Sequence, residues 1–472
     1  MNQTYPPRVD IRELPDDTLL VFLSDSHFGG DPGRDGFEAA AEFSNLLNEL
    51  AALDRPVELV LAGDFFDFLT IAKAPAGANR ATATTGLARY HELFAALRGF
   101  VAQPRRRVTY MPGNHDAEMW WNPAIQKTLR DEGLVEHFAL AYAARFTALP
   151  SRMVYCEHGN EFDPSNAVTD YNDPLDTPVG NHIVTDLLPR LVPSGDGAMA
   201  RDLHDLNKVY PLMEVPVWLA GRLFYDLVSQ ICRLVILPLF IAYAAFRVLV
   251  YLLDALRDDR LSFTASARSA PHVQRLFIDL GVAGVLFFAT FTVLFFVIRR
   301  LTGRVSTSVS ANVPGVNQGA SSMDLIRALL DSDRPMPMSG GLTGCEIDVF
   351  VSGHTHAPSL EAVVRRDGTR TIMVNSGCWL RQLRPAPAHA KAPPVFISTF
   401  VLTHVRIYVS DATLNVELWD CPKPATTPLS RVERLALLHR LPPQPPAGAE
   451  PAILFSAQLT PHGEIASASR AV

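Results

Sequence analysis

Cysteine is scarce in this sequence, and no two cysteines lie close together. The five that occur along 472 residues are widely separated: Cys156, Cys232, Cys345, Cys378 and Cys421. This spacing excludes a thiolate zinc site built on CxxC pairs and argues against a framework of disulfides. We therefore expect the catalytic part of the chain to work in a reducing, cytosolic environment.

The sequence also lacks a surplus of positive charge. Its 42 Lys and Arg are outnumbered by 49 Asp and Glu, which gives a net charge of −7. A nucleic-acid-binding surface requires a basic excess, and the short run Arg105–Arg107 does not supply one. We expect no nucleic-acid partner. The amino-terminal segment has no basic region followed by an apolar core, so we also expect no secretory signal peptide.

What is present is an alternation of strand and helix patterns. Strands are predicted at residues 18–25, 57–64, 106–114 and 151–159, with amphipathic helices at 37–53 and 87–101. Further strands are predicted at 346–356, 369–379, 395–410 and 413–420. This alternation is typical of α/β folds, and we predict layered β-sheets flanked by helices.

The predicted strands fall into two groups, which suggests one domain interrupted by a large insertion. Residues 1–165 and 341–421 would form its two halves, and 166–340 a helical insertion far longer than an ordinary loop. Residues 422–472 are rich in Pro and Ala. We expect a mostly flexible tail there, with one helix at 430–440.

The insertion contains two long apolar segments. Residues 234–253 and 276–298 each reach about the 20 residues that cross a bilayer. The first is the weaker candidate because it contains Pro238 and Arg247. The second contains a single charged residue, Asp279. Basic residues flank both sides, so the positive-inside rule gives no orientation. A transmembrane hairpin, a hairpin embedded in the membrane without crossing it, and a buried helical pair inside a soluble cap all remain open.

Five of the predicted strands end in Asp, Asn or His. Two of them end in pairs at i and i+2, which share one face of an extended segment: Asp25 with His27, and His354 with His356. The other three ends place further polar side chains beside glycines, namely Asp64, Asn114 and His158. Since open α/β sheets bind ligands at the carboxyl ends of their strands, we expect these side chains to meet in one crevice.

Such a crevice would offer carboxylates, imidazoles and an amide oxygen, but no thiolate. These donors suit Mn, Fe, Zn or Ni. Seven donors are too many for one ion, but they suit two ions about 3.5–4 Å apart that share a bridging carboxylate. We therefore predict two divalent metal ions of unspecified identity. Such a pair neutralises phosphoryl oxygens and activates water for in-line attack on phosphorus.

The segments DSH, GDFFD, GNHD, HG and GHTH resemble, in order, the five motifs of the calcineurin-like metallophosphoesterase family. The resemblance covers about residues 18–160 and 345–380. It implies a metallophosphoesterase, with Asp25, His27 and His356 at one ion, Asn114, His158 and His354 at the second, and Asp64 as the bridge. By the same resemblance His115 would stabilise the phosphoryl charge and protonate the leaving oxygen, with Asp116 orienting its ring.

Other polar residues near the motifs are weaker candidates. Asp67 could support a neighbouring ligand, and Asp163 or Asn166 could line the rim of the pocket. Arg381 could reach a substrate phosphate. His182 and His204, in the insertion, are expected to be ordinary surface histidines.

The apolar insertion favours an amphipathic or lipid-linked substrate. We expect the protein to be membrane-associated, with a cytoplasmic catalytic domain and an unknown oligomeric state. The layout is loosely similar to UDP-2,3-diacylglucosamine hydrolases, but those enzymes have Arg where this chain has His115. Two alternatives stay open: a membrane-anchored scaffold or binding protein that keeps the fold, and a soluble nucleotide phosphodiesterase with a buried helical cap.

Overall fold

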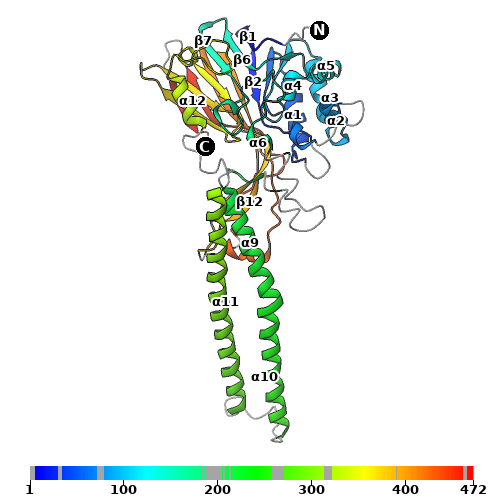
Figure 1. Ribbon diagram of the computed structural model, residues 1–472, viewed down its shortest axis with the longest axis vertical. Helices are drawn as coiled ribbons and strands as arrows, with labels where there is room; N and C mark the ends of the chain where they lie inside the picture. The colour runs from blue at the N-terminus through cyan, green and yellow to red at the C-terminus, as the bar shows by residue number, and fades with distance from the viewer. Residues whose placement is uncertain are drawn as a thin grey trace.

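The computed structural model describes most of the chain. The described residues are 6–29, 35–71, 79–182, 185, 205, 208–211, 214–257, 271–312, 322–389, 391–438, 440–460 and 465–470. Two β-sheets form the body of the molecule, and a long helical hairpin projects from it (Figure 1).

The smaller sheet has six strands. Their order is β1 (Val9–Leu14), β6 (Ala141–Phe146), β7 (Leu149–Cys156), β8 (Val349–Ser352), β10 (Arg370–Asn375) and β9 (Ser359–Val364). The pairs β7–β8 and β8–β10 are parallel. Two halves of the chain that are almost 200 residues apart in sequence are therefore joined edge to edge at β7 and β8.

The larger sheet has nine strands. Its order is β15 (Ile465–Arg470), β14 (Ala452–Leu459), β13 (Thr413–Asp420), β12 (Val395–Ser410), β2 (Leu19–Leu23), β3 (Val57–Ala62), β4 (Arg106–Met111) and β5 (His137–Phe138), with β11 (Trp379–Ala386) also paired to β12. Strands β2, β3, β4 and β5 are parallel neighbours. Their carboxyl ends therefore lie along one edge.

The two sheets pack face to face. Leu20, Phe22 and Val60 of the larger sheet share a buried cluster with Val154 and Val349 of the smaller one. Helices cover the outer faces. Phe43, Leu46, Leu47 and Leu50 repeat at helical spacing on α1 (Ala40–Ala52) and are buried against the larger sheet together with α3 (His91–Val101). The predicted α/β sandwich flanked by helices is confirmed.

Shorter helices lie along the connections between these strands. They are α2 (Arg80–Thr85), α4 (Glu118–Trp121), α5 (Pro123–Asp131), α6 (Val179–His182) and α12 (Ser322–Leu330). Helix α12 packs on the smaller sheet, where Ile326, Leu330, Met336 and Met338 are buried. The last part of the predicted insertion therefore belongs to the core of the sandwich.

The hairpin consists of two long antiparallel helical arms. One arm runs from α9 (Val215–Ile231) through a π-helical turn (Cys232–Ile236) into α10 (Leu237–Arg257), and the other is α11 (Pro271–Asn312). The π-helical turn lies just before Pro238, so the helix absorbs the missing backbone donor without ending.

Both arms are long and apolar enough to cross a membrane. In the most apolar windows, 0% and 11% of the residues are buried inside the protein. The arms extend beyond the sandwich and contact mainly each other in their outer part (Figure 1). A buried helical pair inside a soluble cap is therefore not what the described residues form.

The carboxyl-terminal tail differs from the flexible segment predicted after residue 422. Helix α13 (Arg431–Ala436) begins at a capping box between Ser430 and Glu433, and β14 pairs antiparallel with β13, with a register shift between Leu418 and Trp419. The composition in Pro and Ala misled the prediction, because the apolar strand β14 finds a partner at the open edge of β13 and extends the sheet.

Candidate dinuclear metal centre

The seven predicted ligands all lie just beyond strand ends. Asp25 and His27 follow β2, Asp64 follows β3 and Asn114 follows β4. His158 follows β7, and His354 and His356 follow β8. The crevice is therefore formed where the two sheets bring these strand ends together.

Several of these residues have an uncommon backbone conformation. Five have positive φ angles of 50° to 64°: Asp25, His27, Asp64, His354 and His356. Such left-handed backbone costs of the order of 1 kcal/mol per non-glycine residue and is concentrated at functional sites. The strained turns direct the side chains inward instead of letting them continue the strands.

The first group of donors contains Asp25, His27 and His356. Asp25 Oδ1 lies 3.2 Å from His356 Nε2 and 3.9 Å from His27 Nε2. The two imidazole Nε2 atoms are 3.2 Å apart. One donor atom from each residue thus falls within the space that a single ion would occupy.

The second group contains Asp64, His158 and His354, whose donor atoms also cluster together. Asp64 Oδ2 lies 3.3 Å from His158 Nε2 and 3.8 Å from His27 Nε2 of the first group. Asp64 therefore stands between the two groups, where a bridging carboxylate would be expected. Asn114 is buried beside them, with Asn181 Nδ2 of α6 placed 3.4 Å from its carbonyl oxygen.

The donor atoms suit metal ions because several have no other role. Asp25 Oδ1, Asn114 Oδ1 and His158 Nε2 are buried and form no hydrogen bond within the described part of the chain. Unsatisfied buried polar atoms are costly, and here they converge. His158 Nδ1 donates to the carbonyl of Ala62 at 2.8 Å, which leaves Nε2 as the free ring nitrogen.

The electrostatics of the crevice also favour bound cations. Burial lowers the pKa of His158, but the charges of Asp64 and Asp25 outweigh it and raise the pKa to about 10. The protein thus stabilises positive charge beside these carboxylates. For His27, burial and the neighbouring His115 lower the pKa to about 4, so this imidazole is neutral and available for coordination.

Glycines beside the ligands have no side chain, which leaves room for the metal-binding groups. A Cβ at Gly113 would overlap the carboxylate of Asp64 and the ring of His158. A Cβ at Gly63 would overlap the same imidazole, and the φ of +92° there also favours glycine.

His115 lies at the edge of the centre, with its ring centroid 4.5 Å from that of His27. Its Nδ1 lies 2.9 Å from Asp67 Oδ1, and its backbone N–H donates to Asp64. Burial lowers the pKa of His115, but Asp64 and Asp67 outweigh it and raise the pKa to about 9. The imidazole is therefore protonated at neutral pH.

Asp116 was predicted to orient the ring of His115, and that role stays a prediction. Its carboxylate accepts hydrogen bonds from the backbone N–H groups of Phe65, Phe66 and Gly113 and from the Tyr110 hydroxyl. It is fully buried and fixes the loops after β3 and β4. The turn after Asp64 places the side chain of Asp67 next to the His115 imidazole, with Oδ1 2.9 Å from Nδ1.

Of the residues predicted at the rim, Asp163 reaches the centre. Its Oδ2 lies 3.1 Å from His354 Nε2, and Asn166 Nδ2 donates to the same oxygen at 2.7 Å. A carboxylate on one ring nitrogen fixes the tautomer of a histidine whose other nitrogen binds a metal. Asn166 thus acts on the centre only through Asp163.

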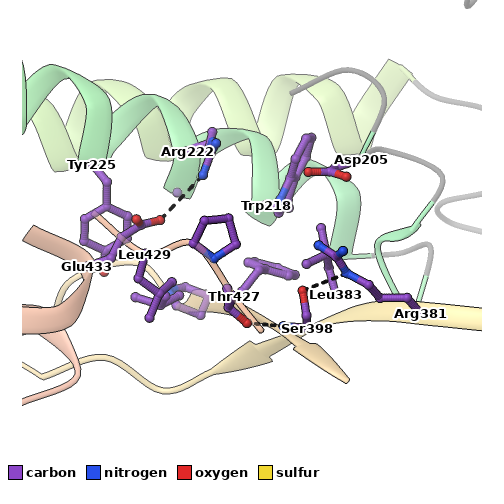
Figure 2. Close-up of a pocket in the computed structure, with 15 residues that line it drawn as sticks. Asp205, Trp218, Arg222, Tyr225, Arg381, Leu383, Ser398, Thr427, Leu429 and Glu433 are labelled. Atoms are coloured by element: carbon purple, nitrogen blue, oxygen red, sulfur yellow. Dashed lines mark hydrogen bonds and ion pairs between the residues drawn. The ribbon is translucent and has the colours of Figure 1, made fainter. Parts of the chain in front are cut away.

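Arg381 lies elsewhere. It points to the interface between β11 and α9, where its Nε donates to Ser398 Oγ at 3.1 Å and Nη1 lies 3.3 Å from Glu38 (Figure 2). The alternation of β11 explains this position, since the next residue, Gln382, faces the crevice and donates to the carbonyl of His356.

Three supporting residues near the centre were not predicted from the sequence. Asn375 donates to the carbonyl of Gly353 at 2.6 Å, Ser24 bonds to Asp25, and Asn181 approaches Asn114. Asn375 ends β10 in the segment VNSG, so the same strand-end pattern could have identified it. His182 bonds to Thr177 and is not among the donors; His204 lies outside the described residues.

Comparison with known families agrees with this geometry. Residues 18–206 match the family model described as calcineurin-like phosphoesterase. The matched region includes the first four motifs and extends beyond the predicted boundary at residue 165, while His354 and His356 lie outside it. No curated protein matches the chain, and the UDP-2,3-diacylglucosamine hydrolase branch is not confirmed. Residues 18–206 thus form a calcineurin-like phosphoesterase domain, which supports a hydrolase that acts on phosphoester bonds.

Proposed function

We propose that the protein is a dimetal phosphohydrolase of a lipid-linked phosphoester or pyrophosphate at the cytoplasmic face of a membrane. The observation that supports the dimetal centre is the set of unsatisfied buried donors on both sides of Asp64. Asp25, His27 and His356 would hold one divalent ion, and Asn114, His158 and His354 the other, with Asp64 between them.

Bound divalent ions supply neutralisation of the phosphoryl charge and a water of lowered pKa. The chain supplies the remaining functions. His115, protonated and held by Asp67, is positioned to hydrogen-bond a phosphoryl oxygen and to give its proton to the leaving oxygen. Asp64 accepts the backbone N–H of His115, which couples the position of this acid to the bridging carboxylate.

The lipid-linked substrate is inferred from the hairpin. Its exposed apolar residues line both arms over a length that matches a bilayer, and the apolar surface would otherwise face water. Two crossings return the chain to the side where it started, so the catalytic domain stays on one side. Five free cysteines favour the reducing, cytoplasmic side.

The chemistry is tested with an aryl phosphate and protein loaded with Mn²⁺. We expect turnover by the wild type, and loss to the metal-free background for Asp64→Ala and for His356→Ala. The matched control is Asp54→Ala, an exposed aspartate whose ion-pair partner among the described residues is Arg105. Unchanged turnover in folded Asp64→Ala, verified by circular dichroism, would contradict the proposal.

The membrane part is tested separately by washing membranes with alkaline carbonate and profiling the lipid phosphates that the extracted enzyme consumes. We expect the protein to stay in the membrane fraction and to deplete a phosphorylated lipid. Release into the soluble fraction would remove the lipid-linked substrate while leaving the metal chemistry in place.

A further inference from the structure

A large cavity lies outside the metal centre, where the hairpin joins the catalytic domain. It measures about 670 Å³ and is formed by α9, α11 and the loop of residues 391–394. One part of its lining is apolar, with Val217, Ala220 and Phe296, and another part is cationic, with Arg299, Arg300 and Lys391. No acidic residue lines it.

The three cations have no acidic partner within the part of the chain that the structure describes. Two other arginines of the hairpin are paired, since Arg247 meets Asp279 and Arg222 Nη1 lies 3.8 Å from Glu433. None of the ion pairs formed by described residues includes Arg299, Arg300 or Lys391. Three uncompensated charges around one cavity create a positive potential that favours an anion.

The cavity lies near the end of the apolar surface. On α11 the described exposed hydrophobic residues run from Phe277 to Val297, Arg299 and Arg300 follow the buried Ile298, and Leu301 is the one exposed hydrophobic residue beyond them among the described residues of α11. The distance along the helix from Phe277 to Ile298 is about 32 Å at 1.5 Å per residue, close to the hydrocarbon thickness of about 30 Å. In a membrane-inserted hairpin, the arginines would therefore stand at the level of the lipid headgroups.

The wall opposite the arginines is held in place. Tyr225 on α9 donates its hydroxyl hydrogen to the carbonyl of Pro393 at 2.6 Å. Gly221 lets the same loop approach, because a Cβ there would lie 3.2 Å from the carbonyl oxygen of Pro394. Lys391 lies in the same loop and lines the cavity.

We propose that this cavity binds the phosphate headgroup of an anionic phospholipid from the surrounding bilayer. The cations would contact the phosphate, while Val217, Ala220 and Phe296 would contact the glycerol and the start of the acyl chains. Basic pockets between membrane helices recognise headgroups in this way. The proposal rests on the membrane insertion proposed above, but it concerns a site separate from the dimetal centre.

The test uses the full-length protein in detergent micelles, titrated with phosphatidylglycerol, with phosphatidylcholine and with inorganic phosphate. We expect tighter binding of phosphatidylglycerol than of phosphatidylcholine. Each removed charge should weaken that binding about 5-fold, so Arg299→Gln/Arg300→Gln should lose most of the preference and Lys391→Gln part of it. Arg431→Gln, an exposed arginine on α13, is the matched control and should bind like the wild type.

Equal affinity of the wild type for the two lipids would overturn the proposal, as would an unchanged preference in Arg299→Gln/Arg300→Gln. Saturable binding of inorganic phosphate without any lipid preference would also overturn it, in favour of a soluble anion. Aryl phosphate turnover is measured in parallel. If the double variant loses lipid binding but keeps normal turnover, the lipid site is separate from the metal centre. If the double variant also stays in the membrane fraction after a carbonate wash, the loss of lipid binding is not caused by a loss of membrane insertion.

Discussion

His115 and Asp67 form the smallest unit of the site whose role can be tested on its own. Their contact of 2.9 Å fixes the imidazole beside the bridging carboxylate. We predict that Asp67→Asn lowers kcat about 10- to 100-fold and changes KM little, because the ring loses its orienting charge while the predicted ligands stay in place. The measurement is steady-state turnover of an aryl phosphate across pH, where the activity of the variant should fall off at a lower pH than that of the wild type.

Asp116 provides the contrast to Asp67. It accepts hydrogen bonds from three backbone N–H groups and one hydroxyl in a fully buried position. We predict that Asp116→Asn lowers the thermal midpoint by several degrees, because an amide offers one acceptor oxygen fewer and leaves a buried donor unsatisfied. A midpoint equal to that of the wild type, combined with loss of activity, would return Asp116 to a direct role in orienting His115.

His404, which is not among the predicted metal ligands, predicts a pH dependence of stability. It is buried between Trp379 and Trp419, where burial and then the charge of Arg406 hold its pKa well below the usual range. As pH falls below about 6.5, the unfolded chain binds a proton that the folded chain excludes, and stability decreases by up to about 1.4 kcal/mol per pH unit.

The check for His404 is denaturant unfolding between pH 7.5 and 5 for the wild type and His404→Asn. Other buried groups titrate in both proteins, so the difference between the two isolates this residue. The variant should show the shallower loss on acidification. If the free energy of unfolding fell equally with pH in the two proteins, His404 would be protonated in the folded protein as well.

At the residue scale, the sequence alone predicted the candidate metal ligands but not all of the residues that support them. The rule that strand ends converge depends only on chain direction, and the structure brings six of the seven predicted ligands together, while Asn114 stays a prediction. The roles of Asp67 and Asp116 depend on how each side chain leaves its turn. That direction follows from tertiary contacts, such as the backbone donors around Asp116, which spacing does not reveal.

At the scale of elements, the hairpin contains an ion pair between its two arms. Arg247 on α10 contacts Asp279 on α11, and the two residues had seemed separate exceptions in otherwise apolar segments. We predict that Arg247→Leu or Asp279→Leu alone destabilises the hairpin by about 2–3 kcal/mol, because each leaves one charge unpaired in an apolar setting.

The double variant Arg247→Leu/Asp279→Leu should recover most of that loss. Thermal midpoints of the detergent-solubilised protein, compared as a double-mutant cycle, measure the coupling. Strictly additive effects would show that the two residues do not interact in the solubilised protein.

The boundaries of helices and strands were predicted accurately where the local sequence pattern is strong. The continuous apolar run of β2 and the helical spacing of α1 were predicted within a few residues. Strand β14 was missed because proline-rich segments surround it and its partner β13 is its main source of order. A strand of this kind, next to the edge of the sheet, is determined by the sheet that it joins more than by its own sequence.

At the scale of the whole molecule, metal binding should stabilise the sandwich as a unit. The donors come from both sheets, so an ion bound among them links β2, β3 and β4 with β7 and β8. Ligands that bind only the folded state stabilise it by about 2.7 kcal/mol at 100 times Kd. We predict that a chelator lowers the thermal midpoint of the wild type and has much less effect on Asp64→Ala.

The alpha-helical hairpin and the sandwich are joined through α9, which packs on β11 and β12 beside Arg381 and Trp218 (Figure 2). This contact could not be predicted, because both partners lie far apart in sequence and neither has a motif. The family resemblance concerned only the sandwich. The position of the hairpin relative to the crevice therefore came from the structure alone.

The number of metal ions per chain tests the central claim most directly. Purified protein is loaded with Mn²⁺, freed of unbound ions and analysed by elemental mass spectrometry against protein concentration. We expect two ions per wild-type chain, about one for His356→Ala and for His354→Ala, and close to none for Asp64→Ala. A wild-type chain that holds no ion, or an Asp64→Ala variant that holds two, would contradict the dimetal centre.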